Sequence, residues 1–318
     1  MGRKRRDWPM TEKQKRIYEN LWHQVEKLFN YRNHDQGFRG TERYREGLRA
    51  FCKYLAIHYG SKNFRNISDQ HLQSFIGASQ RAGVSTKTIK TDLAAIRKLH
   101  MKVDRTRYKL SDNQGIGYHE KRSSRGVDRA WRDSEVRNAI ALARSSGRYD
   151  VAWSLGIARY GGLRIEEATA LSKTQIRDAL RKGYITLRVT KGGIPRDVPL
   201  AAPVRMIFRE ILEVPNSSER VFVRHGRTHH QAFKSIQNWI YNNREHFQER
   251  VILDSGYAGQ MKIDERPDLT YHGLRHSYAR EQYELRVEAG FTQREARQEV
   301  AALLGHGRDD VTRIYTKT

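Results

Sequence analysis

The chain has 318 residues, enough for two domains of ordinary size, and its 37% hydrophobic and 30% charged residues are typical of a folded soluble protein rather than a disordered one. No apolar run approaches the roughly 20 residues that cross a bilayer, and the first six residues lack the apolar stretch of a signal peptide. The single cysteine, Cys52, excludes an intrachain disulfide and a cysteine-rich zinc site. We therefore expect a cytoplasmic protein with no membrane partner.

The charge of the chain is strongly positive and unevenly distributed. Sixty Lys and Arg residues against 36 Asp and Glu residues give a formal net charge of +24, and residues 1–132 contain 30 of the basic and 13 of the acidic residues. The basic residues are not confined to one amphipathic helix, as they would be in a segment that lies on an anionic membrane. This distribution indicates a polyanionic partner, and nucleic acid fits it best.

Four helices are predicted in the first part of the chain. Apolar residues recur at helical spacing over 17–29, 44–59, 72–76 and 89–99. Ser68 is the expected N-cap of the third helix, and Ser85 or Thr86 that of the fourth. These segments predict a small all-α domain over 1–110. Four basic residues of the last helix lie largely off its apolar stripe, where DNA phosphates could reach them: Lys87, Lys90, Arg97 and Lys98.

Helical periodicity stops over residues 111–132, which predicts a flexible basic linker. Gly115 and Gly117 do not indicate a nucleotide-binding loop, because the full fingerprint is absent and no strand precedes them. We expect three basic residues of the linker to contact DNA: Lys121, Arg122 and Arg125.

A second domain is predicted over 133–318, with Asp133 as the cap of its first helix. A helix over 151–160 ends at Gly161-Gly162, and another begins within 163–167. Alternating apolar residues over 184–189 predict a strand, Lys191-Gly192-Gly193 turns the chain, and 194–199 returns as an edge strand of an antiparallel hairpin. Further helices are expected at about 203–213, 230–246, 273–288 and 293–304.

Several segments of this domain place side chains that suit phosphate chemistry at turns and helix ends. Arg164 begins a helix after a glycine break, where the helix dipole disfavours a cation unless an anion is held there too. Glu167 lies one turn further and can orient the Arg164 guanidinium. His272 and Arg275 share a helical face and pair a titratable group with a permanent cation.

Three further residues of the same domain are also candidates for phosphate chemistry. Lys191 lies at the hairpin turn, where it could enter a site and give a proton to a leaving oxygen. His306 follows a glycine at a helix end, and Tyr315 lies close behind it. Taken alone, each of these residues also fits a structural or solvent-exposed role.

The order of these residues resembles the tyrosine recombinases, the phage integrase family. The matching motifs are Gly-Leu-Arg-x-x-Glu at 162–167, the hairpin Lys191, His-x-x-Arg at 272–275, Leu-Gly-His at 304–306 and Ile-Tyr-Thr at 314–316. The resemblance spans 133–318, and the basic helical domain before it is similar to the core-binding domain of the family. It implies an α+β catalytic domain, so that the chain is mainly α with a small antiparallel β-sheet.

The resemblance implies cleavage and rejoining of DNA strands without metal, nucleotide or another cofactor. Arg164 and Arg275 would hold the nonbridging oxygens of the scissile phosphate and stabilise the charge of the transition state. His306 would donate a further hydrogen bond to this phosphate. Glu167 would support the site.

The resemblance also assigns the groups that move protons and form the covalent bond. Tyr315 would attack phosphorus and give a 3′-phosphotyrosine and a free 5′ hydroxyl. Because a free phenol has a pKa near ~10, it needs a proton acceptor, and His272 is the candidate. Lys191 would protonate the departing 5′ oxygen.

The implied partners are double-stranded DNA recombination sites of a mobile element, bound by a homotetramer on two sites. Accessory DNA-bending proteins are further candidate partners. Two features depart from the family pattern. Only Thr316-Lys317-Thr318 follow the expected nucleophile, where many members continue into a helix that docks on a neighbouring protomer. Residues 248–269 are long for the link before His272 and are expected to form a loop that wraps DNA or a partner subunit.

Alternative interpretations remain open at this point. A type IB topoisomerase or a telomere resolvase can share the same chemistry, and a catalytically silent architectural protein would share the charge. The imidazoles within 224–230 could bind a transition metal, but a basic loop that faces DNA is the preferred interpretation. All of the DNA-binding alternatives predict an affinity that falls steeply with salt.

Overall fold

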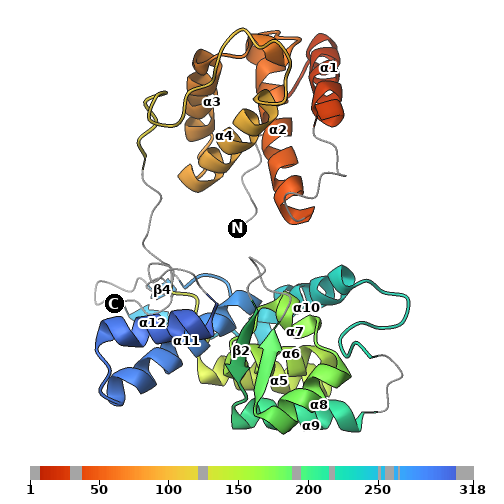
Figure 1. Cartoon of the computed structure of the whole chain (residues 1–318), viewed down its shortest axis with the longest axis vertical. Helices are drawn as coiled ribbons and strands as arrows, with labels where there is room; N and C mark the ends of the chain where they lie inside the picture. Colours follow the sequence, from red (N-terminus) through yellow and green to blue (C-terminus); the bar gives the residue numbers. More distant parts are fainter. Residues whose placement is uncertain are drawn as a thin grey trace. The chain divides into compact units, whose positions relative to one another are not determined.

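The computed structural model describes residues 8–28, 38–120, 128–187, 195–214, 219–249, 252–254, 261–263 and 266–305. The chain divides into two compact units, Met1–Ser123 and Ser124–Thr318 (Figure 1). The described residues of each unit form a hydrophobic core of their own. Within the described ranges, no helix combines the length and the apolarity that crossing a bilayer requires.

Unit 1 is helical, as the apolar spacing predicts. Its described elements are α1 (Glu12–Leu28), α2 (Phe38–His58), a 3₁₀ turn (Phe64–Asn66), α3 (Asp69–Arg81) and α4 (Thr86–His100). Ser68 and Ser85 are the N-caps of α3 and α4, as expected, and the Ser85 hydroxyl accepts a hydrogen bond from the Thr88 backbone N–H at 3.2 Å. Local capping chemistry therefore fixes where these two helices begin.

The core of unit 1 depends on a close approach of α2 and α4. A Cβ at Gly47 of α2 would lie 2.5 Å from the carboxylate of Asp92, so only glycine fits there without displacement. Asp92 is buried in α4 and pairs with Arg43 of α2 at 2.6 Å. This ion pair orients the two helices, because breaking it would leave the buried charge of Asp92 uncompensated.

The segment 111–120, which the sequence analysis assigns to a flexible linker, packs on unit 1. Ile116 and Tyr118 are buried in its hydrophobic core. At the other end of the expected linker, Trp131 is buried in the core of unit 2. The absence of helical periodicity predicts an irregular segment correctly, but it does not reveal that scattered side chains anchor that segment.

Unit 2 is built mainly of helices around the largely buried α6. The described helices are α5 (Asp133–Ser145), α6 (Tyr149–Gly161), α7 (Ile165–Thr169), α8 (Lys173–Lys182), α9 (Ala202–Glu213), α10 (His229–Asn243), a 3₁₀ turn (Arg244–His246), α11 (Tyr271–Glu288) and α12 (Gln293–Leu303). The sequence analysis does not predict α8. It also assigns the cap of α5 to Asp133, whereas Arg132 is the N-cap and Asp133 the first helical residue, since Glu135 accepts from the Arg132 backbone N–H at 2.7 Å.

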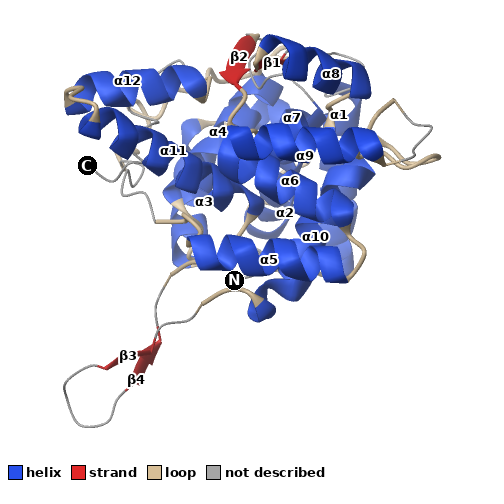
Figure 2. Cartoon of the chain, turned by 90° about the horizontal axis from the view of Figure 1, so that it is seen from below, coloured by secondary structure: helices blue, strands red, loops and turns tan. Residues whose placement is uncertain are grey.

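Two short antiparallel hairpins complete unit 2. Strands β1 (Tyr184–Leu187) and β2 (Arg196–Pro199) pair in the register Ile185 opposite Val198, and residues 188–194, with the expected turn, lie outside the described residues. The expected loop 248–269 instead contains β3 (Ile252–Asp254) and β4 (Met261–Ile263), which Figure 2 shows projecting from the helices of this unit. Strands of three residues are too short for an alternating pattern to stand out.

The predicted fold class, mainly α with a small antiparallel β-sheet, is confirmed. A separate cluster of buried side chains holds α12 against α11, and Tyr278, Tyr283 and Val300 belong to it. Because Leu304, directly after α12, is also buried in this cluster, the end of α12 has a fixed position relative to α11. That position matters for the arginines described next.

Candidate active site

The turn after α6 is the first part of the site. Gly162 ends the helix in the left-handed conformation, with φ of 65°, and a Cβ at this position would collide with the ring of Tyr278. Glycine is therefore required twice, by backbone angle and by space. The carbonyl of Gly162 accepts a hydrogen bond from the Arg275 guanidinium, which links the turn to α11.

Arg164 and Glu167 occupy the two ends of the first turn of α7. Arg164 is the N-cap, and Glu167 accepts a hydrogen bond from its backbone N–H at 2.9 Å and from its guanidinium at 2.7 Å. The contact between the two side chains that the sequence analysis expects is therefore present. It neutralises part of the unfavourable interaction of the Arg164 cation with the positive end of the helix.

Arg196, the first residue of β2, shares the same carboxylate. Its Nη1 and Nη2 donate to Oε1 and Oε2 of Glu167 at 2.9 and 2.8 Å, and its Nε donates to the carbonyl of Leu303 at 3.2 Å. The sequence analysis misses this residue, since a lone arginine at the start of a strand has no spacing that relates it to Arg164. Only its position directly after the hairpin turn could have suggested a role.

The arginines meet at the C-terminal end of α12. The carbonyl oxygen of Leu304 accepts hydrogen bonds from Arg275 and, at 3.5 Å, from Arg164. Arg196 binds the preceding carbonyl. Helix C-termini carry a partial negative charge and leave their last carbonyls without helical partners, which favours cations. Arg164 and Arg275, which the sequence analysis assigns to one phosphate, thus bind the same oxygen atom.

The charge of Glu167 is fixed by this arrangement. The side chain is 3% exposed, and burial by itself raises the pKa of a carboxyl group. The hydrogen bonds and charges of Arg196 and Arg164 outweigh burial and lower the pKa of Glu167 to about 2. The carboxylate therefore remains ionised at physiological pH and keeps both guanidiniums oriented.

The first turn of α11 is held in place by the segment that precedes α5. A Cβ at Gly273 would collide with the Arg129 carbonyl and the Trp131 ring. Trp131 donates from its indole nitrogen to the Thr270 carbonyl at 2.9 Å, and its backbone N–H donates to the Ser277 hydroxyl at 2.8 Å. The backbone that carries His272 and Arg275 is thus fixed relative to the start of unit 2.

His272 and Arg275 differ in their surroundings. Arg275 is 1% exposed, whereas His272 is exposed on the same helix, with its ring 5.1 Å from that of His276. Burial, with smaller contributions from the nearby charges of His272 and Arg129, lowers the pKa of His276 to about 3. The imidazole next to His272 is therefore the neutral one of His276. His272 itself faces solvent, one turn from Arg275.

The remaining expected catalytic residues, Lys191, His306 and Tyr315, lie outside the described residues. In the sequence, Lys191 lies between β1 and β2, and His306 and Tyr315 follow Gly305. Gly305 has a φ of 61°, and a Cβ there would lie 2.9 Å from the Arg196 side chain. The structure thus brings together Arg164, Glu167 and Arg275 of the expected site.

The expected DNA contacts of unit 1 have unequal environments. Lys87 is exposed, Lys98 is half-buried, and the Lys90 ammonium lies 5.8 Å from the Tyr118 ring centre. Arg97 is used internally, because its Nε and Nη1 donate to the Ser111 carbonyl and the Asn113 side chain at 2.6 and 2.9 Å. Arg97 therefore anchors the segment after α4 rather than facing a free surface. The other three expected contacts lie outside the described residues: Lys121, Arg122 and Arg125.

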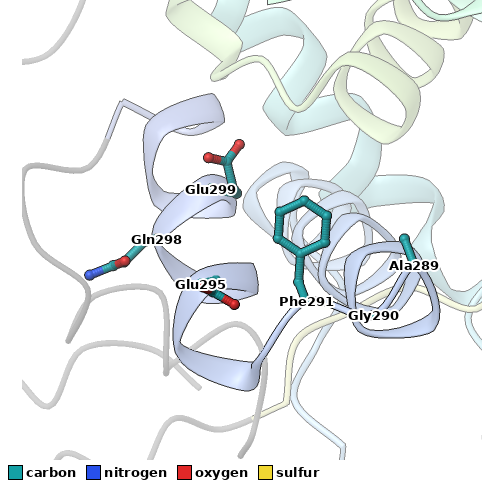
Figure 3. Close-up of a pocket in the computed structure, with 6 residues that line it drawn as sticks. All are labelled: Ala289, Gly290, Phe291, Glu295, Gln298 and Glu299. Carbon is teal, nitrogen blue, oxygen red and sulfur yellow. The ribbon is translucent and has the colours of Figure 1, made fainter.

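Two other features of unit 2 are separate from these arginines. Figure 3 shows a hollow at the turn between α11 and α12, lined by Ala289, Gly290, Phe291, Glu295, Gln298 and Glu299. None of the expected site residues that the structure describes lines it. In the region of 224–230, the Nε2 of His229 lies 2.8 Å from the Thr169 hydroxyl, and no group of three metal-ligating side chains occurs in the part of the chain that the structure describes.

Comparisons with known proteins show which family the chain is similar to. A model of the phage integrase N-terminal SAM-like domain matches residues 39–105, and the model of the phage integrase family matches residues 131–318. The tyrosine recombinase XerA of Pyrococcus furiosus is 28% identical over 160 residues. That match covers 50% of this chain and 47% of the relative, so the chain spans about half the length of this curated relative.

Two solved structures resemble the chain over most of its length. A lambda integrase dimer bound to a COC′ core site has a TM-score of 0.60 and 16% identity, and the Tn1549 transposon integrase in complex with transposon right end DNA has 0.56 and 14%. Each comparison covers 94% of both chains. At these identities the similarity concerns the fold. Because the family model matches more than half of the chain, the protein belongs to the phage integrase family, the tyrosine recombinases.

Proposed function

We propose that this protein is a site-specific DNA recombinase or integrase of a mobile element, which cleaves and rejoins strands through a 3′-phosphotyrosine intermediate. The observation that carries the proposal is the meeting of Arg164 and Arg275 at the carbonyl oxygen of Leu304. Two guanidiniums from separate helices that share one oxygen are arranged to bind one phosphate instead. Arginine forks match phosphate oxygens in geometry and in charge.

The proposed chemistry combines these arginines with the residues that the family resemblance assigns to the other steps. The Oη of Tyr315 attacks phosphorus while its proton passes to His272, and the bond from phosphorus to the 5′ oxygen breaks as Lys191 protonates that oxygen. Arg164, Arg275 and His306 stabilise the charge that gathers on the phosphoryl oxygens. The phosphotyrosine retains the phosphodiester bond energy. A 5′ hydroxyl of another strand can therefore reverse the step, and rejoining needs no nucleotide.

The proposed substrate is double-stranded DNA that carries recombination sites, bound in the cytoplasm by a homotetramer on two sites. The net charge of +24 supports it, as does the description of the similar lambda and Tn1549 integrases as complexes with DNA. Of the four contacts expected on α4, Lys87 is the exposed one, and we propose it as a phosphate contact of unit 1. We propose that the domains 1–110 and 133–318 both contact the DNA, with the basic segment 111–132 between them in the sequence.

A covalent-trapping experiment tests the proposal. The protein is incubated with DNA that carries a candidate site and a nick near the cleavage position, and the covalent complex is separated under denaturing conditions. We expect wild type to form the complex, Tyr315→Phe to bind DNA without forming it, and Arg275→Lys to form much less of it. Tyr241→Phe is the matched control, since Tyr241 is 70% exposed and the change removes only one hydroxyl.

The outcomes separate the candidate activities. A covalent complex with Tyr315→Phe would show that another residue is the nucleophile. Efficient relaxation of supercoiled DNA with no preference for a paired site would favour a type IB topoisomerase. Binding without cleavage on every cognate site would favour a silent architectural protein and contradict the proposal.

A further inference from the structure

We propose that Arg196 is a positioning residue of the active site, which holds Glu167 and the end of α12 so that Arg164 and Arg275 can face the scissile phosphate. This inference rests on the function proposed above. It concerns a residue of β2 that none of the sequence motifs includes.

The contacts of Arg196 join three separate segments of unit 2. Its two terminal nitrogens bind both oxygens of Glu167 on α7, and its Nε binds the carbonyl of Leu303 at the end of α12. The side chain is only 8% exposed. A planar fork that satisfies three acceptors in one plane fixes their relative positions, which a flexible ammonium cannot do.

The chain after α12 is shaped around the same side chain. Gly305 adopts a φ of 61°, and a Cβ at this position would lie 2.9 Å from Cδ and 3.0 Å from Nη1 of Arg196. The backbone thus passes Arg196 at a distance that only glycine allows. Since Leu304 accepts from both Arg164 and Arg275, Arg196 holds the peptide next to the atom at which the two phosphate-binding arginines meet.

Arg196 also determines how strongly Glu167 holds Arg164. In the structure, Glu167 accepts two hydrogen bonds from Arg196 and two from Arg164. If Arg196 is lost, Arg164 is the remaining guanidinium bound to a buried carboxylate. The carboxylate then competes with the DNA phosphate for Arg164, because an isolated buried charge is costly.

If Arg196 only stabilised the fold, its loss would not make Glu167 compete with DNA for Arg164. The pH dependence of the rate therefore distinguishes a positioning role of Arg196 from a purely stabilising one. Among the residues that the structure describes, the groups that interact with the charge of Glu167 are Arg164 of the α7 N-terminus, Arg196 of β2 and Tyr271 of α11. Arg275 of α11 binds the same Leu304 oxygen as Arg164. Burial, and secondarily the Glu167 charge, raises the pKa of Tyr271 far above the physiological range. Removal of Arg196 takes away hydrogen bonds and a positive charge that lower the pKa of Glu167, so the pKa of this buried carboxyl group rises and Glu167 is the group of this set expected to take up a proton as the pH falls.

The test compares Arg196→Met and Arg196→Lys with Arg144→Met as the matched control. Arg144 also forms a bidentate pair, with Glu210 at 2.7 and 2.6 Å, but that pair joins α5 and α9 and includes no active-site residue. The measurements are DNA affinity and the single-turnover rate of covalent complex formation. We expect R196M to bind DNA normally and to lose about 100-fold in rate, the scale of a displaced catalytic group. R196K should lie between R196M and wild type, and R144M should match wild type.

The pH dependence of the rate of covalent complex formation is a measurement that a purely structural role of Arg196 would leave unchanged. The ratio of the wild-type rate to the R196M rate should be largest at pH 8, where ionised Glu167 holds Arg164 alone, and should fall toward pH 5 as Glu167 takes up a proton. The same ratio measured in the Glu167→Gln background should not change with pH. R196K, which keeps the charge, should give a nearly flat ratio.

Several outcomes would overturn the inference. R196M and R196K with wild-type rates would do so, and so would a pH-dependent ratio that persists in the E167Q background. If R196M fails to fold by circular dichroism, R196K and its pH profile decide the matter, since a rate equal to wild type excludes a positioning role. Failure of the proposed function is distinguishable, because wild type itself would then form no covalent complex.

Discussion

Replacing Gly162 with alanine perturbs the turn on which Arg164 and Arg275, the two arginines proposed to bind phosphate, depend. Gly162 has a φ of 65°, its carbonyl accepts a hydrogen bond from Arg275, and the next helix begins with Arg164 as its cap. An added methyl group meets the ring of Tyr278 from α11. The substitution therefore acts on the backbone angle and on the packing between α11 and the turn at the same time.

The magnitude has two parts. Holding a residue with a side chain in the left-handed region costs about 1–2 kcal/mol. Forcing a methyl group into a packed interior costs about 1–3 kcal/mol, because neighbouring side chains leave their preferred rotamers. We expect Gly162→Ala to lower the free energy of unfolding of unit 2 by about 2–5 kcal/mol. In a Tyr278→Ala background the steric part disappears, and the same change should cost about 1–2 kcal/mol.

Urea unfolding followed by tryptophan fluorescence measures this loss. Of the five tryptophans, Trp8 and Trp22 lie in unit 1, so a background with both changed to Phe reports on unit 2 alone. The midpoint should fall at an unchanged slope. Covalent complex formation should fall as well, because displacement of the turn moves Arg275. A Gly162→Ala protein within 0.5 kcal/mol of its parent, or an equal loss with and without Tyr278, would refute the reasoning.

Three further predictions follow from the charged groups. Glu167→Gln should lower the free energy of unfolding of unit 2 at pH 7 by about 3 kcal/mol, since the pKa of Glu167 is lowered from 4.5 to about 2 and each pKa unit corresponds to about 1.4 kcal/mol. This contribution of Glu167 is complete above pH 4.5 and is lost as the pH falls toward 2. Urea unfolding should therefore give a larger difference in stability between variant and wild type at pH 7 than at about pH 2.5. His276 should remain neutral down to about pH 4 in an NMR titration, and a midpoint near 6.5 would contradict its burial. Arg97→Ala should lower the stability of unit 1, whereas Lys87→Ala should leave stability unchanged and reduce the salt dependence of DNA binding by about one counterion. An equal effect of both changes on the salt slope would show that Arg97 also faces DNA.

Local rules predicted most of the secondary structure. Helical spacing and capping serines located the helices of unit 1, and alternation located the β1–β2 hairpin. Three elements were missed for a local reason: the buried residues of α8 are Ile176 and Ala179, too few to show a period, and β3 and β4 are each three residues long. A pattern needs several repeats before it differs from chance.

The motif order predicted a set of side chains for the site, because guanidinium, imidazole and phenol groups at these spacings suit phosphoryl transfer. Arg164, Glu167 and Arg275 are close together in the structure as that order implies. The order did not indicate which other residues hold them. Leu304 belongs to the Leu-Gly-His motif, but the motif does not indicate a role for its carbonyl, since a backbone oxygen has no residue identity. Arg196 has only its position after the hairpin turn as a signal, since an arginine has no preferred separation from its partner.

The amino-acid sequence by itself determined the family, the helical character of both units and the charge that favours DNA, since these depend on composition, short-range periodicity and residue order. The tertiary structure alone decided that Arg97 anchors a loop, that residues 111–120 belong to a core, and that Arg196 links β2 to α7 and α12. Each of these depends on atoms far apart in the chain approaching within hydrogen-bond distance. Only the packing of the helices sets those distances.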